Sequence, residues 1–211
     1  MYQDRMNRAQ TAFSAALSAG FQERVLTPTG TFFITLVDEK TGEVLQSIEK
    51  KNIITLDAGI LGSMLFRDNA SRAQSLYMLS IGTGATGNLL SPDAPDNRQR
   101  KLNNEIARKP FSSTTFRNAA GAAVAIPTNI VDFTTTFTSA DPNGALNEMG
   151  LISPISTNPA PGNWQPNPNN YPTYDPAVDL TLYDILVNYL TFPILAKGPG
   201  MSLTVTWRLT F

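Results

Sequence analysis

The last nine residues of the chain alternate strictly between apolar and polar side chains. The apolar set is Leu203, Val205, Trp207, Leu209 and Phe211, and threonines and an arginine stand between them. Successive residues of a strand point to opposite faces, so this alternation predicts a half-buried antiparallel strand. We expect Phe211 to face the core, which would tie the end of the chain into a sheet.

Further strands are predicted along most of the chain. Residues 30–37 and 43–50 form a hairpin around the turn residues 38–42. The segments 75–81, 101–117, 129–138 and 183–193 also favour extended structure, the last with a bend at Pro193. Seven to nine strands with one polar face each predict a mainly β fold, an antiparallel β-sandwich or jelly-roll-like domain.

Two helices are expected beside the strands. Residues 6–21 repeat apolar side chains near helical spacing, with Phe13, Leu17 and Phe21 on the stripe. We predict an N-terminal helical arm over 1–24 and a β-sandwich domain over 25–211. The arm could pack on its own domain or dock on a neighbour.

A short internal helix is expected from about residue 55 to residue 66. Thr55 is a candidate N-cap, because its hydroxyl could accept a bond from the first turn. Leu61, Leu65 and Phe66 would then face the core.

Composition excludes several kinds of chemistry. The 211 residues include no histidine and no cysteine, which removes catalytic triads, thiolate or imidazole metal sites and disulfides. Charged residues make up 16% and the net charge is −1, so no basic surplus points to nucleic acid. No apolar run reaches the roughly 18 residues of a membrane span. We expect no cofactor, nucleic-acid partner or membrane partner.

A glycine-rich motif at residues 82–87 matches the spacing G-x-G-x-x-G after a predicted strand. A dinucleotide loop of this kind must open a helix whose N-terminus holds the pyrophosphate. Here Pro92 and Pro95 follow closely, which argues against a long helix. We therefore interpret the motif as a turn leaving a strand.

A proline-rich loop is predicted at 154–176, with seven of the 15 prolines of the chain. Loops of this length usually bind something or lie on a partner. Trp164, Tyr171 and Tyr174 lie within it. They could contact a neighbouring subunit or a sugar, or they could anchor the loop to its own domain.

Two glutamates follow asparagine in apolar surroundings. Glu105 and Glu148 could form a glycosidase pair, which needs two carboxyls flanking a bond in an open cleft. The alternative is a structural ion-pair network of Glu105, Arg108 and Glu148, in which either glutamate pairs with the arginine across strands.

The order of segments resembles that of small structural proteins of tailed bacteriophages. The resemblance covers roughly residues 30–211 and rests on these segments: the hairpin at 38–42, Lys51 to Gly59, Ile81 to Gly84, Leu102 with Glu105 and Arg108, Asn147 to Leu151, Phe192 to Lys197, and Leu203 to Trp207. It implies a non-catalytic β-rich virion subunit on the capsid or on the tail.

Two hypotheses about function follow from these patterns. In the first, the chain is a virion component that contacts other virion proteins as a symmetric homo-oligomer. Its assembly contacts would be Phe13, Leu17, Phe21, Trp164, Tyr171 and Tyr174. In the alternative, the chain is a carbohydrate-binding module for host attachment, and the loop aromatics stack on a host glycan.

Overall fold

The computed structural model describes residues 28–67, 75–155, 166–168, 178 and 182–211. Within these residues lie twelve strands and one complete helix, α2 (Leu56–Arg67). The strands are β1 (Thr29–Asp38), β2 (Val44–Ile54), β3 (Met78–Gly82), β4 (Gly87–Asn88), β5 (Ser91–Pro92), β6 (Glu105–Pro110), β7 (Ser113–Arg117), β8 (Ala123–Val124), β9 (Ile130–Phe137), β10 (Gly144–Ser153), β11 (Ile185–Lys197) and β12 (Met201–Thr210). The mainly β fold is confirmed. The predicted helix at 6–21 lies outside the described residues.

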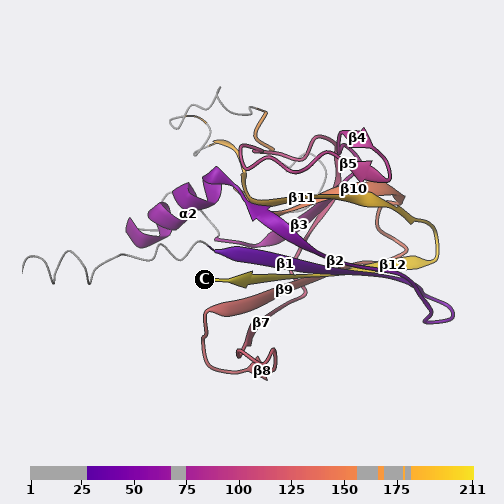
Figure 1. The fold of residues 1–211 in the computed structure, drawn as a ribbon, viewed down its shortest axis with the longest axis horizontal. Coiled ribbons are helices and arrows are strands. Elements are labelled where there is room, and N and C mark those ends of the chain that lie inside the picture. The colour runs from indigo at the N-terminus through magenta and orange to yellow at the C-terminus, as the bar shows by residue number, and fades with distance from the viewer. Residues whose placement is uncertain (1–27, 68–74, 156–165, 169–177, 179–181) are drawn as a thin grey trace, which may run out of the picture.

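Ten strands form one antiparallel sheet in the order β6-β3-β10-β11-β2-β1-β12-β9-β7-β8, and β4 pairs with β5. The large sheet folds over into two layers, which Figure 1 shows with β10 and β11 above β1, β12 and β9. We call them the β11 layer (β6, β3, β10, β11) and the β1 layer (β1, β12, β9, β7, β8). This is a sandwich arrangement, as predicted.

The layers are joined on both sides. On one side β2 pairs with β1 up to Asn52 and then with β11 through Ile53 and Ile54. On the other side β6 leads into β7, where the N–H of Phe111 donates to the carbonyl of Tyr77, directly before β3, and that of Ser112 donates to the carbonyl of Thr134 of β9. The sandwich therefore has few open strand edges, which limits uncontrolled pairing with other chains.

The core lies between the two layers and follows the predicted alternation. Leu203, Val205, Trp207 and Leu209 of β12 are buried, and Phe32 of β1 stacks obliquely on Trp207 with ring centroids 5.8 Å apart. Burial of such side chains stabilises a fold by roughly 1.5–3 kcal/mol each.

The prediction for Phe211 was wrong in one respect. Its ring is 51% exposed, because β1 and β12 pair only as far as Thr29 and Thr210 and no core remains beyond them. Its backbone is nevertheless hydrogen-bonded to Asn129, directly before β9. The N–H of Phe211 donates to the carbonyl of Asn129 at 2.9 Å, and the Asn129 amide donates back to its carbonyl.

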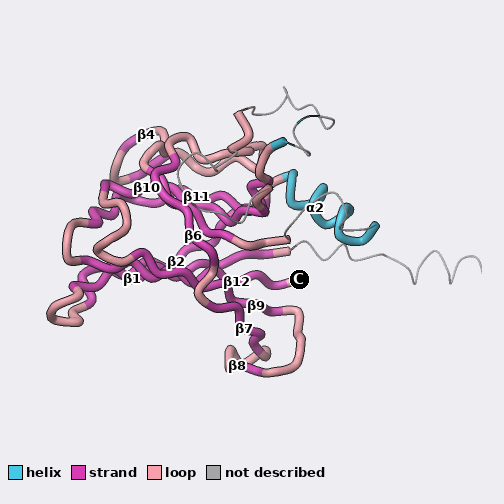
Figure 2. The backbone as a smooth tube through the Cα atoms, turned by 180° about the vertical axis from the view of Figure 1, so that it is seen from behind, coloured by secondary structure: helices cyan, strands magenta, loops and turns pink. Residues whose placement is uncertain are grey.

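Helix α2 packs against β11, with Leu61 buried against Ile185 and Val187. Figure 2 shows α2 extending beyond the end of the strands. Leu65 was expected to be buried and is 47% exposed, which agrees with this overhang. The Thr55 hydroxyl was expected to cap the helix, but it donates to the carbonyls of Leu186 and Val187 and so fastens the helix start to β11.

Candidate functional site

The polar cluster predicted from Glu105 and Glu148 lies on the outer face of the β11 layer. Met149 and Leu190 face the core, so the adjacent Glu148 and Tyr189 point outward. Residues 83–104 lie over this face and bring Leu102 into contact with the same cluster of side chains as Tyr189. The side chains of Glu148 and Tyr189 are therefore buried beneath this loop.

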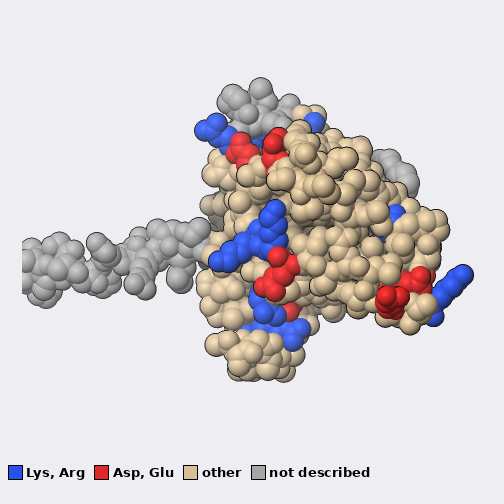
Figure 3. Space-filling model, turned by 45° about the vertical axis from the view of Figure 1, so that its right-hand side comes forward, with Lys and Arg blue, Asp and Glu red and all other residues tan. Residues whose placement is uncertain are grey.

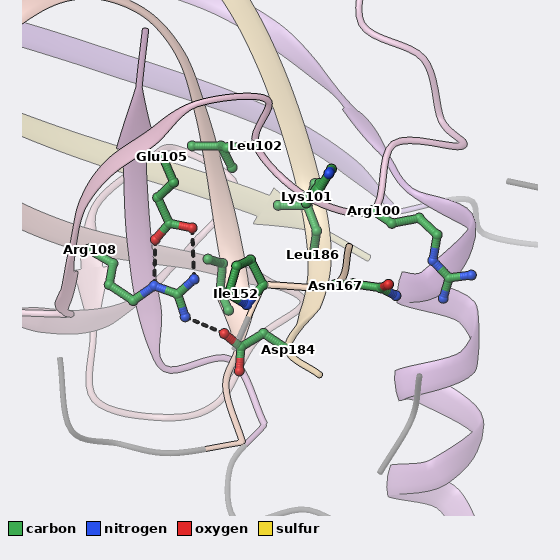
Figure 4. Close-up of a pocket in the computed structure, with 10 residues that line it drawn as sticks. Arg100, Lys101, Leu102, Glu105, Arg108, Ile152, Asn167, Asp184 and Leu186 are labelled. Atoms are coloured by element: carbon green, nitrogen blue, oxygen red, sulfur yellow. Dashed lines mark hydrogen bonds and ion pairs between the residues drawn. The ribbon is translucent and has the colours of Figure 1, made fainter. Parts of the chain in front are cut away.

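A small cavity opens at the edge of this covering loop. Its volume is about 10 Å³, room for about one water molecule. Figure 4 shows the charged side chains that line it, and Asn167 approaches it from a separate segment. The residues at its polar end are Arg100, Glu105, Arg108, Asn167 and Asp184. A cavity of this size does not hold a sugar or a nucleotide.

Arg108 stands between two carboxylates. Its Nε donates to Glu105 Oε1 at 2.5 Å and its Nη2 donates to Oε2 at 2.7 Å. Its Nη1 donates to Asp184, whose other oxygen accepts the N–H of Ile155 at 2.7 Å. Figure 4 shows the guanidinium lying between the two acids. Arg108 and Asp184 together join β6 to both ends of the segment 156–183.

Burial and the Arg108 guanidinium act in opposite directions on the pKa of Glu105. Glu105 and Asp184 are 8% and 5% exposed at the side chain and share one guanidinium. Burial raises the pKa of Glu105, and Arg108 opposes this rise through its hydrogen bonds and its charge. The second acid adds to the rise, because two negative charges lie beside one positive charge.

Glu148 has a different set of partners from the one the sequence suggested. Its Oε1 accepts the N–H groups of Gly84 and Asn104 at 2.9 and 2.8 Å. Its Oε2 accepts the N–H of Asn103 at 3.0 Å and the hydroxyl of Tyr189 at 2.8 Å. The carboxylate is fully buried, and four hydrogen-bond donors satisfy it where an arginine was expected. Burial and this acceptor together raise the pKa of Tyr189.

The glycine-rich motif is part of the same cluster. Gly82 ends β3, no helix follows, and the chain continues through the β4–β5 hairpin. The Gly84 N–H, which a phosphate would need, already binds Glu148, and the N–H of Ala85 binds the side chain of Asn147 at 3.0 Å. The motif therefore serves as a turn that Asn147 and Glu148 hold in place.

Ion pairs at two further sites were not anticipated from the sequence. Asp57 in the first turn of α2 contacts Arg100 at 2.7 Å, with both side chains buried, and so fastens the loop to the helix. Asp132 of β9 accepts from Arg208 at 2.7 Å and from Arg117 at 2.8 Å on the outer face of the β1 layer. Acids and bases at register-paired positions of neighbouring strands were the available signal for Asp132.

Asp184 was also missed, and it is the second acid of the Arg108 cluster. Its position directly before the apolar strand 185–192 was the available signal. The proposed assembly residues Phe13, Leu17, Phe21, Trp164, Tyr171 and Tyr174 lie outside the described residues.

The buried polar groups of this site fix loops to the sheet. Glu105 and Glu148 are both buried and both hydrogen-bonded, so this pair lacks the open cleft that glycoside hydrolysis requires. Among the described residues no group of three acidic side chains is placed to hold a metal ion. In the same residues no helix is long and apolar enough to cross a membrane. The chain matches no protein-family model and no curated protein.

Proposed function

We propose that the chain is a non-enzymatic structural subunit of a tailed-bacteriophage virion. It contacts other virion proteins on the capsid or the tail and assembles as a symmetric homo-oligomer. The segment order that resembles phage structural proteins motivates this proposal, and the two-layer β fold is compatible with it.

One structural observation supports this role above the others. The charged side chains of the outer β11 face are used to fix loops to the sheet, and the cavity among them has room for about one water molecule. A protein whose buried polar groups hold its loops on the sheet is suited to a structural role. Figure 3 adds that charges on the face shown are few and gathered in small groups, which leaves broad neutral surface for contacts.

The test is the oligomeric state of the purified chain by multi-angle light scattering. We expect the full chain to form one defined oligomer and a chain without residues 1–24 to be a monomer. A finer variant replaces Phe13, Leu17 and Phe21 with serine. Its matched control replaces Ser14 and Ser18 with alanine and should leave the oligomer unchanged.

A monomeric full chain at all concentrations would contradict the proposal. A stable oligomer that persists in the truncated chain would contradict the assembly role of residues 1–24. The virion location has its own test: the chain should remain with purified particles through density-gradient sedimentation, in a fixed ratio to the major particle protein.

A further inference from the structure

The buried Lys197, at the end of β11, is hydrogen-bonded to the side-chain amide of Asn143 in the turn between β9 and β10. Lys197 is the last residue of β11 and is 2% exposed. Its Nζ donates to Oδ1 of Asn143 at 2.9 Å and to the carbonyl of Asp141 at 3.3 Å. Asn143 stands directly before Gly144, the first residue of β10.

The environment shifts this amine toward its neutral, nucleophilic form. Within the described residues no carboxylate lies within ion-pair distance of Lys197. Burial lowers the pKa of Lys197, and the positive charge of Lys109 lowers it further, against the attraction of Asp141 and Glu39. A desolvated lysine of this kind is a common nucleophile in proteins.

The turn is also held in a fixed position before any reaction. The Asp141 carboxylate accepts the N–H of Thr138 at 2.7 Å and the ammonium of Lys109 at 2.8 Å. The buried Lys197 amine is already bonded to the Asn143 side chain, so the step is intramolecular and avoids the entropy cost of a bimolecular encounter.

We propose that Lys197 and Asn143 form an intramolecular isopeptide bond. The lone pair on Nζ attacks Cγ of Asn143, the bond from Cγ to Nδ2 breaks, and ammonia leaves. One proton passes from Nζ to the departing nitrogen, so that a single amide N–H remains in the new bond. No atom is oxidised or reduced, and no co-reactant is needed. The bond joins residues 54 positions apart and locks the β9–β10 turn to the end of β11.

The test is the intact mass of the full chain measured under denaturing conditions after incubation at neutral and mildly alkaline pH. We expect a species lighter than the sequence mass by one ammonia. Digestion should then release a branched peptide that contains both Lys197 and Asn143. The variants K197R and N143A should both keep the full mass, while the control K109R, which preserves the charge beside Asp141, should still lose ammonia.

A second reaction at Asn143 would give the same loss of mass and must be separated from the first. Attack by the Gly144 nitrogen would form a cyclic imide, which also releases ammonia but persists in K197R and later hydrolyses. A wild-type chain that keeps its full mass overturns the proposal, and so does a loss of ammonia that survives in K197R. The outcome is independent of the oligomeric state, so it can fail while the virion proposal stands.

Discussion

At the scale of single residues, Glu148 fixes two loop segments at once. Its fully buried carboxylate accepts three backbone N–H groups and one hydroxyl. We predict that E148A lowers the free energy of unfolding by about 3–5 kcal/mol, because four donors lose their acceptor and a fully buried side chain is removed. Urea unfolding checks this value. The control Y189F removes one donor and should cost only about 1 kcal/mol. Equal stability of E148A and the wild type would contradict the role assigned here.

The sequence could single out Glu105 and Glu148, but it did not indicate the other buried acids, which are Asp57, Asp132 and Asp184. Glu105 and Arg108 lie close in the sequence, so their pairing could be anticipated, although positions three apart on a regular strand point to opposite faces. A register shift, in which Ile81 pairs with Ala107 but Gly82 pairs with Glu105, brings the two side chains to one face. The donors to Glu148 are mostly backbone amides, which carry no residue-specific signal in a sequence. Asp184 reaches Arg108 across 76 positions, and only the folded arrangement of β6 and β11 brings them together.

At the scale of elements, the glycines of β3 and α2 differ in how much space a Cβ atom would find. A Cβ on Gly82 of β3 would lie 2.6 Å from the Asn104 carbonyl and 2.6 Å from the Glu148 carboxylate. A Cβ on Gly59 of α2 would meet nothing within 4 Å. We predict that G82A destabilises the fold and that G59A stabilises it by up to about 1 kcal/mol, since alanine favours a helix. Thermal unfolding of both variants checks the two signs. A G82A variant as stable as the wild type would show that the loop over β3 can move freely.

Strands were predicted better than the ends of elements. Alternation identified β9 and β12 because each has one face on the core and one outside. Leu65 and Thr55 were assigned from helical rules alone. Where a helix extends past its sheet, and where a hydroxyl finds a strand carbonyl instead of a helix amide, depends on tertiary packing that a local pattern does not contain.

At the scale of the whole molecule, the pKa values of Asp132 and Glu105 shift in opposite directions, so the two carboxyls affect the free energy of unfolding in different pH ranges. Burial would raise the pKa of Asp132, but hydrogen bonds from Arg208 and Arg117 outweigh it and lower this pKa below 3.8. Its contribution is therefore present above pH 3.8 and lost as the pH falls through the folded value. Glu105 behaves in the opposite way. Its pKa is raised above 4.5 by burial, so its contribution is present below pH 4.5 and lost as the pH rises through the folded value.

Two amide variants separate these contributions in one experiment. We expect the free energy of unfolding of D132N, relative to the wild type, to change with pH only in the acid range below 3.8, where it should fall less steeply. That of E105Q should differ in slope only above 4.5, where the decline of the wild type should disappear. Each slope is limited to about 1.4 kcal/mol per pH unit for one proton. Urea unfolding across a pH series measures both. Parallel curves for all three proteins would show that neither carboxylate changes its proton affinity on folding.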